Sequence, residues 1–174
     1  MNNILAVLPL FFITGCSMFS SASFPPLDTV PQVDVSRYVG TWYEIASFPF
    51  RQQEGCTCTT AEYEMLEEGV LKVTNTCRKE GETDRAVGKA FVVEGTNNAK
   101  LRVQFFWPFR GDYWIIDLAD DYSYAVVGVP SRKYCWVLSR SKSMDDAVYA
   151  GITERVKAKG FDVSKFNRTV HDCP

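Results

Sequence analysis

The sequence is poor in histidine and has no surplus of charge. His171 is the only histidine among 174 residues, which argues against a histidine-ligated metal site and against a histidine-based catalytic relay. The 19 basic and 21 acidic residues give a net charge of −2. Nucleic-acid binding requires clustered Lys and Arg that neutralise phosphates, so we expect no nucleic-acid partner. We also expect no metal ion and no cofactor.

The sequence also lacks an apolar run that is long enough to cross a membrane. Its main apolar block, Ile4–Ile13, has only about half of the roughly 20 residues that a bilayer-spanning helix needs. The length of this block is typical of the hydrophobic region of a secretory signal. We therefore interpret residues 1–15 as a signal peptide.

The signal ends in Ile13-Thr14-Gly15-Cys16, which resembles the bacterial lipoprotein box. The resemblance implies that Cys16 is lipidated and that the mature protein is held to a membrane by its acyl chains. Ser17 after the cysteine resembles the choice of outer-membrane lipoproteins, which implies a periplasm-facing protein at the outer membrane of the bacterial envelope. The alternative is an ordinary secretory signal cleaved near Ala22.

The residues after the cysteine are rich in Ser and Pro and show no periodicity. We therefore predict a tether over residues 16–33. The folded domain is then expected to cover residues 34–174. The sequence leaves the oligomeric state open between monomer and homodimer.

Alternating apolar and polar residues dominate the chain from Thr41 onward. No helix-length segment interrupts them until residue 143, so the pattern predicts an antiparallel meander in an all-β fold. The expected strands are Thr41–Phe48, Thr57–Leu66, Val70–Arg78, Arg85–Glu94, Lys100–Trp107, Tyr113–Leu118, Ser123–Val129 and Tyr134–Arg140. Eight such strands either close into a barrel or split into a sandwich.

Only a short turn separates the second and third expected strands in the sequence, so their pairing register can be predicted. A three-residue turn, Glu67-Glu68-Gly69, pairs Tyr63 with Val73 and Met65 with Leu71 and keeps the apolar faces together. After the eighth strand, Ser143 is expected to cap one helix that Gly160 ends. The narrow stripe Val148, Ile152 and Val156 predicts that this helix lies against the outside of the sheet.

The segment Gly40-Thr41-Trp42-Tyr43-Glu44-Ile45-Ala46 resembles the first signature of the lipocalin family. The likeness continues through Ala61-Glu62-Tyr63, Phe106-Trp107-Pro108-Phe109, Asp121-Tyr122 and Trp136-Val137-Leu138-Ser139-Arg140. It covers about residues 34–173 and is greatest for bacterial outer-membrane lipoprotein lipocalins and apolipoprotein D. It implies an eight-stranded antiparallel up-and-down β-barrel with one C-terminal α-helix packed outside.

The resemblance also assigns structural roles. Gly40, Trp42 and Arg140 are the signature residues, and the Arg and Trp side chains are expected to stack at the closed end of the barrel. At the second signature Asp120 replaces the commoner Thr, which puts the capping role of that hydroxyl in doubt. Glu44 has the same strand parity as Trp42, so we expect an inward carboxylate that needs a partner.

Five cysteines remain after Cys16, so at least one is free or pairs with another chain. The resemblance implies a disulfide between Cys58 and Cys173, and the residues do not assign partners to Cys56, Cys77 and Cys135. The expected ligand-binding residues are four aromatic side chains lining the interior and Arg110 in a loop beside them. Arg110 either pairs with a ligand head group at the mouth or is a solvated charge of the turn. The aromatic residues are Phe105, Trp107, Tyr113 and Trp136.

The resemblance favours a non-enzymatic binding protein for a fatty acid or (lyso)phospholipid, whose tail would be buried in the barrel. One alternative is a lipid-modifying enzyme on the same barrel, for which an inward Cys77 is the only supporting feature. Another is a structural envelope lipoprotein whose core is filled.

Overall fold

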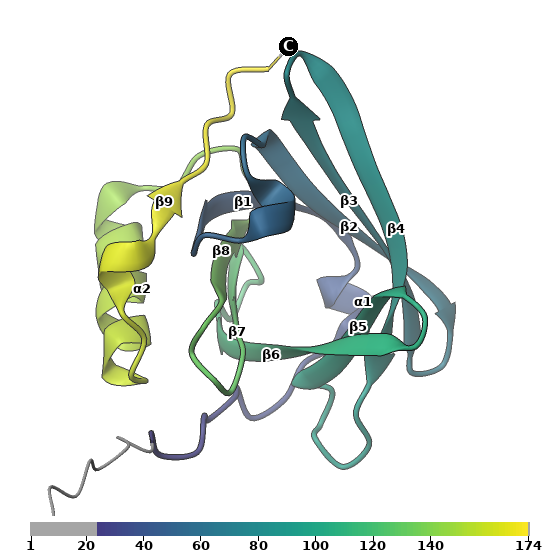
Figure 1. The fold of residues 1–174 in the computed structure, drawn as a ribbon. Helices are drawn as coiled ribbons and strands as arrows, with labels where there is room; N and C mark the ends of the chain where they lie inside the picture. Colours follow the sequence, from purple (N-terminus) through teal and green to yellow (C-terminus); the bar gives the residue numbers. More distant parts are fainter. Residues whose placement is uncertain (1–23, 174) are drawn as a thin grey trace, which may run out of the picture.

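The computed structural model describes residues 24–173, so the predicted signal peptide and Cys16 lie outside the described residues. The described chain forms a closed antiparallel barrel of eight strands with one main helix outside it (Figure 1). The strands are β1 (Gly40–Ser47), β2 (Thr57–Glu67), β3 (Val70–Lys79), β4 (Glu82–Val92), β5 (Lys100–Phe106), β6 (Phe109–Leu118), β7 (Tyr124–Gly128), β8 (Cys135–Ser139) and the short β9 (Asn167–Arg168). The helical elements are α1 (Val35–Tyr38), η1 (Arg51–Gln53), α2 (Asp146–Ala158) and η2 (Val163–Lys165).

The barrel closes through β1, which pairs with both ends of the meander. Its first half pairs with β2, and its second half pairs with β8. The β1–β2 pairing ends at Tyr43, and at Ala46 and Ser47 the short β9 pairs with β1 in addition to β8. Closure removes the free edges that would otherwise remain on the first and last strands.

The predicted register of the second hairpin is confirmed. Tyr63 pairs with Val73 and Met65 pairs with Leu71. Gly69 in the turn has a φ of +74°, a conformation that glycine adopts without steric cost. The next turn also contains a residue pair with positive φ, Glu80 and Gly81, and β4 begins there, three residues before the predicted start.

Two hydrophobic clusters lie on opposite faces of the barrel wall. The inner cluster includes Trp42 and Ile115, both fully buried. The outer cluster lies between the wall and α2, where Ile152 and Val156 are fully buried. Because α2 covers this part of the wall (Figure 1), β8 is apolar on both faces.

The helix begins later than predicted. Asp145, rather than Ser143, is the N-cap, and its carboxylate accepts hydrogen bonds from the N–H groups of Ala147 and Val148. Gly160, with a φ of +86°, follows the last turn as expected.

The residues just before position 34 belong to the predicted tether but pack on the barrel. Leu27 and Val33 are buried, at 5% and 1% exposure. The Val30 N–H donates to Ile115, and Arg132 donates to the carbonyl of Pro25. The Ser- and Pro-rich composition of this segment does not indicate that Leu27 and Val33 are buried. These two side chains hold the described part of the predicted tether on the barrel.

Candidate functional site

The closed end of the barrel is built on the stacking of Arg140 over Trp42. The guanidinium carbon lies 3.7 Å from the centre of the indole ring. Trp42 is fully buried and donates its Nε1–H to the Tyr38 carbonyl over 2.8 Å. The Arg140 nitrogens donate to a row of carbonyls, those of Arg37, Tyr38, Val39 and Thr41, over 2.7–3.2 Å. Arg140 therefore holds α1 across the end of the barrel.

Gly40 joins α1 to β1 beneath this stack. Its φ of +94° is unfavourable for a residue with a side chain. The signature glycine thus allows the chain to turn from α1 into the barrel wall.

The second signature reaches the closed end through Tyr122. Its hydroxyl accepts a hydrogen bond from the Asp34 N–H over 2.8 Å, and Arg37 stacks over its ring at 4.0 Å. Asp120, the residue that departs from the family pattern, contributes its backbone carbonyl to Arg37. This contact does not depend on the side chain at position 120.

The interior wall can be followed through directly paired residues, which share one face of the sheet. Leu101 pairs with Tyr113, Val127 pairs with Trp136, and Phe105 packs against Gly88. A Cβ at Gly88 would lie 2.9 Å from the Phe105 ring. Phe105, Tyr113 and Trp136 all pack against the inner cluster but remain only partly buried. The structure therefore brings together three of the four predicted aromatic residues.

Trp107 does not line the interior, contrary to our expectation, because its side chain is 86% exposed. A bulge between Val103 and Phe106 interrupts the alternation, and Trp107 then falls in the turn between β5 and β6. Its neighbours Phe106 and Phe109 are each 77% exposed.

Arg110 also differs from its expected position. It lies within β6 rather than in a loop. Its guanidinium lies 3.9 Å from the centre of the Phe91 ring, and Phe91 pairs with Arg102 on the outer face. The structure thus places Arg110 on the outside of the wall, away from the three interior aromatic residues.

The mouth of the barrel carries a second aromatic group. The Phe50 ring lies 5.1 Å from Tyr134 and 6.0 Å from Trp136, which stacks with Tyr134. Gln53 of η1 accepts a hydrogen bond from the Trp136 indole over 3.2 Å. The β1–β2 connection therefore contacts Trp136, the aromatic residue at the entrance, through Phe50 and Gln53.

Glu44 has the hydrogen-bond donors that a buried carboxylate requires. The carboxylate is 5% exposed and accepts hydrogen bonds from Gln53, Ser47 and Thr169 over 2.8, 3.1 and 2.6 Å. Three donors compensate for its removal from water. Glu44 consequently ties the β1–β2 connection to the C-terminal segment.

Three tyrosine hydroxyls meet above the closed end. Tyr113 lies 2.7 Å from the Tyr38 oxygen and 2.9 Å from the Tyr63 oxygen. Burial raises the pKa of each phenol above its ordinary value of 10. Alternation in the sequence predicts that Tyr113 lines the interior but does not predict its two hydroxyl partners. The alternation of β2 places Tyr63 on the inner face, whereas the position of Tyr38 depends on how α1 folds over the barrel.

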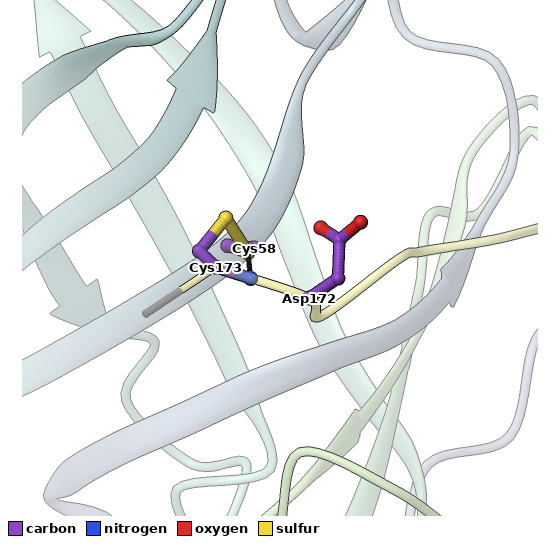
Figure 2. Close-up of side chains that lie close together, drawn as sticks. All are labelled: Cys58, Asp172 and Cys173. Atoms are coloured by element: carbon purple, nitrogen blue, oxygen red, sulfur yellow. Dashed lines mark hydrogen bonds between the residues drawn. A yellow bond between two sulfur atoms is a disulfide. The ribbon is translucent and has the colours of Figure 1, made fainter.

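The cysteines within residues 24–173 form two disulfides. Cys58 bonds to Cys173, the pairing that the resemblance implied, and Cys56 bonds to Cys77. Cys135 is a buried free cysteine beneath α2, and burial raises the pKa of its thiol. Figure 2 shows Asp172 beside the Cys58–Cys173 bond. Because the two sulfurs are bonded to each other, this cluster offers no thiolate to a metal.

None of the helices in residues 24–173 combines the length and the apolar character that a membrane crossing requires. A family model for a lipocalin-like domain matches residues 33–171. Outer membrane lipoprotein Blc of Escherichia coli K12 is 37% identical, over 92% of this chain and 91% of its own length. Apolipoprotein D of Macaca fascicularis is 32% identical, over 81% of this chain and 79% of its own length.

Solved structures agree with the fold. Insecticyanin from Manduca sexta superposes with a TM-score of 0.70 at 23% identity, covering 86% of each chain. The family model and the sequence relatives both span most of the chain, and the barrel carries the signature contacts of Gly40, Trp42 and Arg140. The chain therefore belongs to the lipocalin family.

Proposed function

We propose that this lipocalin is a membrane-anchored carrier that binds a hydrophobic ligand, a fatty acid or lysophospholipid, inside the barrel. The observation that carries the proposal is the partial burial of Phe105, Tyr113 and Trp136, although all three belong to the inner face. Inward side chains that keep accessible surface provide an apolar lining for an alkyl chain. Each CH₂ group transferred from water to this lining contributes about 0.8 kcal/mol.

The aromatic group at the mouth supports the same proposal. Phe50 and Tyr134 flank Trp136, and Gln53 fixes its indole. Ligand pockets commonly combine an apolar lining with a few placed polar groups. A ligand entering from this end would contact Trp136, so its indole is the natural reporter of binding.

The anchor proposal rests on the sequence around Cys16 and on the relatives. The Escherichia coli relative is named an outer membrane lipoprotein, and this chain carries a lipoprotein-box-like sequence before Cys16. We infer that the barrel is held at the periplasmic face of the outer membrane. Metabolic labelling with palmitate tests this inference: the wild type incorporates the label and fractionates with membranes, and a Cys16→Ser variant does neither.

The enzyme alternative depended on an inward Cys77 thiol. That sulfur is bonded to Cys56, and a disulfide sulfur is not a thiolate nucleophile. A carrier without chemistry on its ligand therefore accounts best for the interior.

Titration of the purified domain with hexadecanoic acid and lysophosphatidylcholine tests ligand binding. We expect a saturable change in tryptophan fluorescence that is strongly reduced in Trp136→Phe. Trp107→Phe is the matched control, because Trp107 is outside the interior, and it should retain the signal. Absence of saturation with both lipids would instead favour a structural envelope lipoprotein with a filled core.

A further inference from the structure

The hydroxyl groups of Tyr38, Tyr63 and Tyr113 form a polar group within an otherwise apolar interior. They come from α1, β2 and β6, and the inner cluster surrounds them. Tyr113 is central, since its oxygen contacts both of the others, at 2.7 and 2.9 Å. Clustering three polar atoms in a hydrophobic core has a desolvation cost, which their mutual hydrogen bonds offset only in part.

The number of protons in this group exceeds the number of hydrogen bonds. Each hydroxyl carries one proton, and the three are joined by two O–H···O contacts. Within the described chain, these three hydroxyls make no other hydrogen bond. Whatever the direction of the two bonds, one hydroxyl proton is left to donate to another molecule.

Burial indicates which hydroxyl keeps that proton. Tyr38 and Tyr63 are 1% and 3% exposed, whereas Tyr113 is only partly buried. Tyr63 donates to Tyr113. If Tyr38 also donates to Tyr113, the two deeply buried protons are both bonded and the remaining proton belongs to Tyr113, the least buried of the three residues. This is the arrangement of lowest cost, because a buried donor without a partner is strongly disfavoured.

The chemistry of the group favours an uncharged ligand oxygen. The contacts of the three hydroxyls include no charged side chain. The nearby Arg140 directs its nitrogens to backbone carbonyls of the closed end. A carboxylate or phosphate would therefore be buried without a direct ion pair, at a large desolvation cost, whereas a hydroxyl or carbonyl oxygen needs only the one donor.

We propose that Tyr113, oriented by Tyr38 and Tyr63, is a polar subsite at the closed end that donates a hydrogen bond to the oxygen of a long-chain alcohol or another uncharged single-chain amphiphile. The polar end of such a ligand enters first, and its alkyl chain extends past Phe105 toward Trp136 at the mouth. This inference rests on the proposed binding function and concerns ligands whose uncharged oxygen enters first. A fatty acid or lysophospholipid would instead enter by its alkyl chain and leave its charged head group at the mouth.

The test compares dodecan-1-ol with 1-chlorododecane, which has nearly the same shape but no hydroxyl. Both displace the uncharged fluorescent probe N-phenyl-1-naphthylamine from the purified domain. In Tyr113→Phe we expect dodecan-1-ol to lose about three- to tenfold in affinity relative to 1-chlorododecane, the effect of one hydrogen bond. Tyr43→Phe is the matched control: it removes a tyrosine hydroxyl that lies outside this group, on β1 where the Tyr43 ring contacts His171, so the affinity ratio should stay at the wild-type value.

A second measurement needs no tyrosine variant. In a Trp107→Phe background, 12-bromododecan-1-ol carries a quenching bromine at the end opposite its hydroxyl. We expect it to quench Trp136 at the mouth more than Trp42 at the closed end, so that Trp136→Phe removes most of the quenching. An unchanged affinity ratio in Tyr113→Phe, or quenching that persists after Trp136→Phe, overturns the subsite while leaving ligand binding intact. If neither dodecyl compound displaces the probe, the binding function itself fails.

Discussion

The guanidinium of Arg140 contacts two elements at once. It stacks on Trp42 of β1 at 3.7 Å and donates hydrogen bonds to the carbonyls of Arg37 in α1 and Val39 at its C-terminal end. Residue 140 follows β8, and residue 42 belongs to β1. The pair thus joins the two strands that close the barrel and fixes α1 across its end. We infer that the stability of the closed end depends on the planar, multiply donating shape of the guanidinium.

Arg140→Lys should destabilise the domain although it preserves the charge. A lysine ammonium cannot reach the same row of carbonyls while stacking on Trp42, and the expected loss is about 1–3 kcal/mol. Urea unfolding of the purified domain measures this value. Arg102→Lys is the control, because Arg102 is exposed and lies 3.7 Å from Asp112; such surface pairs contribute at most about 1 kcal/mol. Equal midpoints for the two variants would contradict the role of Arg140.

The two disulfides should differ in their contribution to stability. The Cys58–Cys173 bond closes a loop of 115 residues, and Cys56–Cys77 closes one of 21. Loop entropy in the unfolded chain then predicts about 5 kcal/mol for the first and about 3 kcal/mol for the second. Thermal unfolding of Cys58→Ser/Cys173→Ser and Cys56→Ser/Cys77→Ser double variants compares them. A larger loss from the second pair would show that local strain or packing outweighs chain entropy.

The sequence predicted those parts of the fold that depend on local patterns. The register of β2 and β3 followed from Gly69, because only a three-residue turn keeps Tyr63 and Val73 on one face. The Arg140–Trp42 contact followed from a family signature rather than from the residues alone. The register of this hairpin is determined by two short segments whose alternation is uninterrupted.

The sequence could not predict features that depend on irregular strand ends or on distant contacts. Trp107 was assigned to the interior by alternation, but the bulge after Val103 and the turn of the hairpin move it to the surface. The contact between Tyr38 and Tyr113 joins residues 75 positions apart. Neither residue carries a local signal of the other, since their approach depends on closure of the whole barrel.

Gln53→Ala should release the β1–β2 connection from the mouth. Its amide links the Glu44 carboxylate to the Trp136 indole over 2.8 and 3.2 Å. Removing it leaves Glu44 with one donor fewer at a cost of about 1–2 kcal/mol, and it uncovers Trp136. Acrylamide quenching of tryptophan fluorescence should increase. Gln52→Ala, at an exposed neighbouring position, is the control and should leave the quenching unchanged; the same increase in both variants would contradict a specific link.

Alkaline pH should destabilise the domain through its buried tyrosines. Burial raises the pKa of Tyr38, Tyr63 and Tyr113 above the ordinary value of 10, so above pH 10 the unfolded chain loses these protons before the folded one. The folded state then binds more protons, and its stability, fully present below pH 10, falls as the pH rises further. Absorbance of ionised phenol and circular dichroism, recorded across the same titration, measure this coupling. The three buried phenols should ionise only as the fold is lost, whereas replacing all three with Phe should remove this part of the pH dependence. Ionisation of all eight tyrosines in a domain that stays folded would contradict the prediction.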